Sequence, residues 1–155
     1  MAPVDDTAKL ANVRRSLRKF FVDNLYSTEG KEIVFDKWMA IPNVLSMAST
    51  VNEWYSINFG ALELANMADM EVTVFCCTQN DDNNLKLEAL RDILFAYLRD
   101  STQLDGIRRI PFLNQSDTVI GGLMIVNILE SGDLEGEDGT KYYSLTCQIR
   151  FASKV

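Results

Sequence analysis

The C-terminal part of the chain constrains the fold most, because it holds two strand-like segments around a glycine-rich acidic stretch. Residues 142–151 alternate strictly between apolar and polar side chains, which predicts a strand with one buried face. Residues 119–129 are almost continuously apolar, which predicts a strand covered on both faces. Between them, residues 130–141 hold three glycines and five carboxylates. We therefore expect a long antiparallel hairpin with a flexible, acidic tip of these twelve residues.

Upstream, hydrophobic spacing predicts two helices and three further strands. The helices are expected over residues 7–25 and 85–100, and the strands over residues 31–38, 51–59 and 70–78. Residues 40–50 are expected to form a loop, and residues 60–68 fit either a loop or a helical turn. Gly106 and Pro111 indicate a short connection after the second helix. This order predicts one α+β domain over residues 1–155, an antiparallel sheet with two helices packed on one face.

The charge of the chain is acidic and uneven. The net charge is −7: residues 1–50 hold seven basic and six acidic groups, and residues 51–155 hold eight basic and sixteen acidic groups. Tight binding of nucleic acid needs a surface rich in lysine and arginine, so this balance argues against it, although DNA could still pass nearby. No secretory signal or membrane-spanning run stands out, so we expect a soluble, intracellular protein without membrane contact.

The sequence offers little that could do chemistry. It has no histidine, so the usual base for a serine or cysteine nucleophile is missing, and so is the commonest nitrogen ligand of zinc. Its three cysteines lack metal-site spacing and are expected to be reduced, with Cys76 and Cys77 on opposite faces of a strand. Gly121 and Gly122 fit a bulge or a close backbone approach better than a phosphate loop. The acidic stretch fails the spacing of a calcium loop. We expect no enzyme activity, cofactor or metal.

Two charged sets are candidates for contact with partner proteins. Three arginines lie within five residues of the first helix: Arg14, Arg15 and Arg18. They form either a solvated face or a docking site for an acidic partner. The acidic set comprises Glu130, Asp133, Glu135, Glu137 and Asp138. A basic helix face meeting an acidic edge, or the hairpin reaching a neighbour, would supply a contact with another protein.

Several segments together resemble the phage tail terminator family, also called neck terminator or tail completion proteins. The resemblance covers most of the chain and lies in residues 13–25, 35–38 with 41–42, 70–78, 87–94 and 148–151. It implies a small α+β subunit that forms a ring, usually a hexamer, at the head-proximal end of the tail tube. Such a ring ends tube polymerisation, binds the tube protein and a head-completion or connector protein, and lets DNA pass without specific binding.

The resemblance also implies a place in the tail or neck of the virion, after assembly in the host cytoplasm. Family members lack catalytic residues, so the resemblance assigns no functional position. Three alternatives stay open: another neck, connector or tube component; a monomeric regulatory binding module; and a small enzyme that uses a carboxylate pair or Ser–Lys chemistry.

Overall fold

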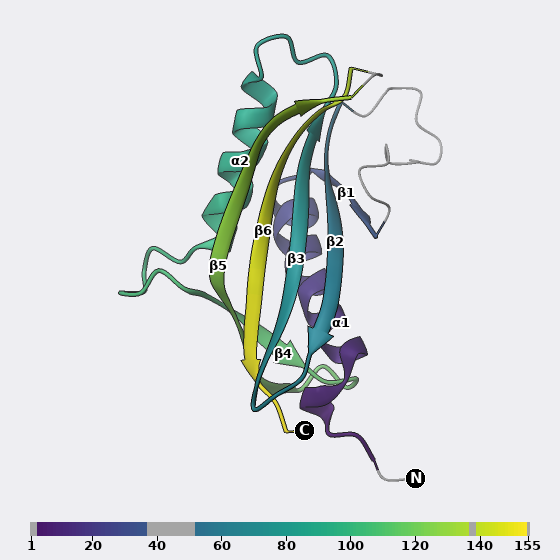
Figure 1. Cartoon of the computed structure of the whole chain (residues 1–155), viewed down its shortest axis with the longest axis vertical. Helices are drawn as coiled ribbons and strands as arrows, with labels where there is room; N and C mark the ends of the chain where they lie inside the picture. Colours follow the sequence, from purple (N-terminus) through teal and green to yellow (C-terminus); the bar gives the residue numbers. More distant parts are fainter. Residues whose placement is uncertain (1–2, 37–51, 137–138, 155) are drawn as a thin grey trace.

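The computed structural model describes residues 3–36, 52–136 and 139–154. Its helical segments are η1 (Asp6–Ala8), α1 (Leu10–Phe21), η2 (Val22–Thr28) and α2 (Leu85–Leu98). Its strands are β1 (Glu32–Phe35), β2 (Glu53–Glu63), β3 (Met67–Thr78), β4 (Arg108–Leu113), β5 (Val119–Glu135) and β6 (Lys141–Ala152). Both long helices lie on the same side of a curled sheet (Figure 1). The predicted α+β class, with its long C-terminal hairpin, is confirmed.

The sheet has six strands in the order β1-β2-β3-β6-β5-β4. Every neighbouring pair is antiparallel except β1 and β2, which are parallel, so the sheet is mixed rather than wholly antiparallel. A parallel pair needs a crossover of about a dozen residues or more, and the 17 residues between Phe35 and Glu53 are long enough for one. The expected loop over residues 40–50 falls outside the described residues.

The core lies between the two helices and the sheet face that they cover. The helices bury apolar residues at helical spacing against it: Val13, Leu17 and Phe21 from α1, and Leu87, Leu90, Leu94 and Leu98 from α2. The inward positions of β6 alternate as predicted, with Leu145, Cys147, Ile149 and Phe151 fully buried. Cys76 faces this core, while Cys77 joins Trp54 and Phe75 on the opposite face, as predicted.

The predicted N-terminal helix is divided into three segments. Asp5 accepts a hydrogen bond from the Thr7 amide and so caps η1, which precedes α1. Beyond α1 the chain continues in the wider turns of η2, so helical structure extends past the predicted end at residue 25. Leu25 is fully buried, whereas Leu10, at the start of α1, is 39% exposed.

Two predictions about β5 are wrong. Only Leu123 and Ile125 of this strand are buried, and Val119 is 63% exposed. Leu129 is 66% exposed because it lies on the face of β5 that the helices do not cover. The tip was also predicted too long, because β5 extends to Glu135 and β6 starts at Lys141. Pairing with β6 uses backbone groups, and an irregularity between Ser131 and Leu134 accommodates the glycine and acidic residues there.

The segment around Pro111 is a strand, β4, and not a connection. β4 lies at the edge of the sheet, where the missing N–H of proline leaves no ladder bond unmade. Gly121 and Gly122 pair in register with Phe112 and Pro111, and the register shifts between the Phe112–Gly121 and Leu113–Val119 pairs, next to the two glycines. Residues 60–68, left open by the sequence, form the end of β2 and the turn into β3. No helix in the described part of the chain is long and apolar enough to cross a membrane.

Candidate interaction surfaces

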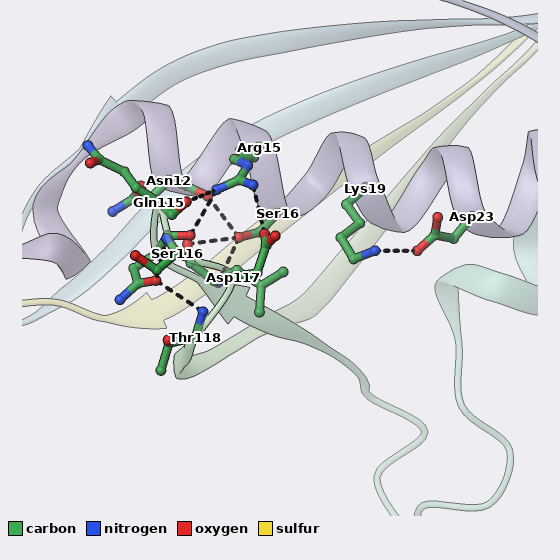
Figure 2. A network of polar contacts seen from close by, with 11 residues as sticks. Asn12, Arg15, Ser16, Lys19, Asp23, Gln115, Ser116, Asp117 and Thr118 are labelled. Carbon is green, nitrogen blue, oxygen red and sulfur yellow. Dashed lines mark hydrogen bonds and ion pairs between the residues drawn. The ribbon is translucent and has the colours of Figure 1, made fainter.

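Arg15 of the predicted basic set anchors α1 to the turn between β4 and β5. Its guanidinium donates to the carbonyl oxygens of Asn114 and Gln115 at 3.0 and 2.9 Å, and lies 2.7 Å from the Asp117 carboxylate. Figure 2 shows this contact beside Ser16, with the ion pair between Lys19 of α1 and Asp23 of η2 further along the helical segment. Much of the hydrogen-bonding capacity of Arg15 is therefore used within its own chain.

Arg14 and Arg18 lie on a different side of α1, over the ring of Phe59 in β2. Their guanidinium carbons are 5.7 and 5.1 Å from the ring centroid, within the range of cation–π attraction. Arg18 also lies 3.6 Å from the carboxylate of Asp36. Arg15 instead contacts the turn between β4 and β5, so the structure does not gather the three arginines into one basic patch. Their docking role stays a prediction.

Glu130 of the predicted acidic set is bound to α2. Its two carboxylate oxygens accept from Nε and an Nη of Arg91 at 2.6 and 3.0 Å, and Tyr143 donates to it at 3.2 Å. Arg91 also stacks over Phe95, 4.3 Å from the ring centroid. The hydrogen bonds from Arg91 hold the pKa of Glu130 below its ordinary value. The pair thus fixes the outer part of β5 to the helix.

A groove lies between α2 and the hairpin, lined by Leu87, Glu88, Arg91, Asp92, Asp133 and Tyr143. The lining and Glu130 together hold four carboxylates and one guanidinium, a net charge of −3. Glu135 lies at the far end of β5, opposite Lys141, whose ammonium donates to Asn84 of the loop before α2 at 2.6 Å. Glu137 and Asp138 fall outside the described residues.

The two predicted sets are not brought together: no ion pair joins them in the described ranges. The sequence did not single out Glu88, Arg91 and Asp92, because charges on the solvent face of a helix carry no signal of their own. These three residues can be recognised as one wall of a groove only when the structure places β5 beside α2.

The outer half of β5 has a free backbone edge. β4 pairs with β5 only from Val119 to Ile125, so residues 127–135 are paired with β6 alone within the part of the chain that the structure describes. In Figure 1, β4 lies at the end of the sheet where β5 begins, and α2 lies beside its other end. The pairing partners of Leu129 and Leu134 are Thr146 and Tyr142, which face away from the helices, so both leucines do too.

The three thiols are poorly suited to chemistry. Burial raises the pKa of Cys77 and of Cys147 to about 12, and that of Cys76 is also raised, chiefly by burial. All three are therefore protonated at neutral pH, and a thiol is a weak nucleophile compared with a thiolate. Among the described residues, no group of three or more His, Cys, Asp and Glu side chains is placed to hold a metal ion.

Comparison of the chain with models of known protein families and with curated proteins gave no match.

Proposed function

We propose that this chain is a structural virion protein that forms a ring at the head-proximal end of a phage tail tube. There it ends tube polymerisation and joins the tail to head-completion proteins. The β5–β6 hairpin supports the proposal most directly, because β5 extends beyond β4 and exposes Leu129 and Leu134 beside an unpaired strand edge. Exposed apolar side chains and free backbone groups are features of surfaces that assemble with other proteins.

Two separate surfaces fit the two kinds of contact that the proposal requires. The side of α1 that carries Arg14 and Arg18 lies over β2 and offers a surface for a neighbouring subunit. β5, beyond β3 and β6, offers a separate surface for a head-completion protein. The acidic balance of the chain suits a channel through which DNA slides without being held.

Assembly of the purified protein on tail tubes tests this proposal. We expect sedimentation to reveal a closed oligomer, alone or after tubes of the tube protein are added, and electron microscopy to place a labelled copy at one tube end. Growth of the labelled tubes should stop. A chain that stays monomeric, binds no tube end and leaves tube growth unchanged would refute the proposal.

A further inference from the structure

We propose that the free edge of β5, residues 127–135, binds an extended segment of a partner protein as an additional strand. The segment has basic side chains on one face and apolar side chains on the other. Backbone pairing supplies the affinity in this mode of recognition, and alternating side chains supply the specificity. This strand-binding edge goes beyond the ring proposal, because it does not require the chain to assemble with itself.

The two faces of the strand-binding edge define the partner. On the side of the helices, an incoming strand would meet Glu130 and Asp133 on β5, with Glu88 and Asp92 across the groove on α2. Between Arg109 and Lys141 the sequence has no lysine or arginine, and Arg91, which lines the groove from α2, is already paired with Glu130. On the other side, Leu129 and Leu134 offer exposed apolar surface. A strand in which basic and apolar residues alternate matches both faces.

A second copy of this chain fits the edge less well. Pairing two copies through the same edge would set acidic residues against one another, which destabilises a strand pair. The strand β1 has Glu32 and no basic residue. The other edge strand, β4, is basic, but Pro111 has no N–H and the Leu113 amide already donates to Ser16 at 2.9 Å. A different protein is therefore the better partner.

Hydrogen exchange and fluorescence anisotropy at physiological ionic strength test this proposal with a synthetic peptide probe. The peptide has the same length as the free edge, and lysine and valine alternate along it. We expect slowed exchange at residues 127–135, and affinity at least about tenfold weaker for a matching glutamate–valine peptide. N-methylation of alternate peptide nitrogens should abolish binding, because it removes the backbone donors. Protection elsewhere, or equal affinity for the two peptides, would overturn the proposal.

Charge variants locate the site. Glu88→Lys and Asp133→Lys should each weaken binding of the lysine–valine peptide about tenfold. Glu71→Lys, at an exposed position of β3, should change the affinity for this peptide less than about twofold. Melting temperatures ensure that all three variants are folded. An equal loss in the Glu71 variant would mean that net charge alone attracts the peptide. If protection of the edge from hydrogen exchange rose with the concentration of the protein and not with that of the peptide, a second copy of the chain would be the partner. Either result refutes the proposal.

Discussion

Ser16 should be one of the polar residues on which the stability of the domain depends. Its buried hydroxyl donates to the Asn12 carbonyl at 2.8 Å and accepts from the Leu113 amide at 2.9 Å, which joins α1 to the edge strand β4 (Figure 2). Ser16→Ala leaves that buried N–H without a partner, at a cost of about 2 kcal/mol. Alanine returns about 0.5 kcal/mol because it is the better helix former. The net loss in the free energy of unfolding should be about 1.5 kcal/mol.

Urea unfolding monitored by circular dichroism measures this loss, and the melting temperature should fall by about 3–6 °C. Ser131→Ala makes the same chemical change at an exposed position of β5 and should alter the free energy of unfolding by less than about 0.5 kcal/mol. If Ser16→Ala were no more destabilising than this control, the hydroxyl would not be what joins α1 to β4.

Three further outcomes follow from buried or paired groups. The three buried thiols should resist a thiol reagent at pH about 8 in the native protein and react fully in denaturant; rapid native labelling would contradict their burial. Glu130→Gln should cost about 1 kcal/mol at neutral pH. Because pairing with Arg91 lowers the pKa of Glu130, that difference should shrink as pH falls through the lowered value; a difference independent of pH would contradict the pairing. Asp81→Ala should cost about 1–2 kcal/mol because Asp81 accepts from the Lys86 and Leu87 amides at the start of α2, and Asp81→Asn should cost less. Equal losses in thermal unfolding would count against the cap.

The sequence predicted the fold well where periodicity reports burial. The alternation that ends at Phe151 and the leucine spacing of α2 gave the correct elements, because one face of each is buried against the same core. The apolar run of β5 led to a wrong prediction, because it was expected to be covered on both faces and one face is exposed. Strands covered on both faces and strands with an exposed apolar face look alike in sequence, and only the placement of both helices on one side distinguishes them.

Local signals also failed where the position in the sheet decides the outcome. Pro111 is a turn signal in isolation, yet an edge strand accepts it. Gly132 and Asp133 favour a loop, yet the backbone of β6 holds them in a long hairpin. The groove beside β5 joins α2 to residues about forty positions away, so no local pattern could reveal it.

The central proposal, that this chain ends a tail tube and joins it to the head, is tested most directly by depletion of the protein in the phage that produces it. Electron microscopy of the resulting lysate gives tail length and head attachment in one measurement. We expect tails of irregular and excessive length, unjoined to filled heads, and rescue by the wild-type chain supplied in trans. Tails of normal length joined to heads in the depleted lysate would contradict the proposal.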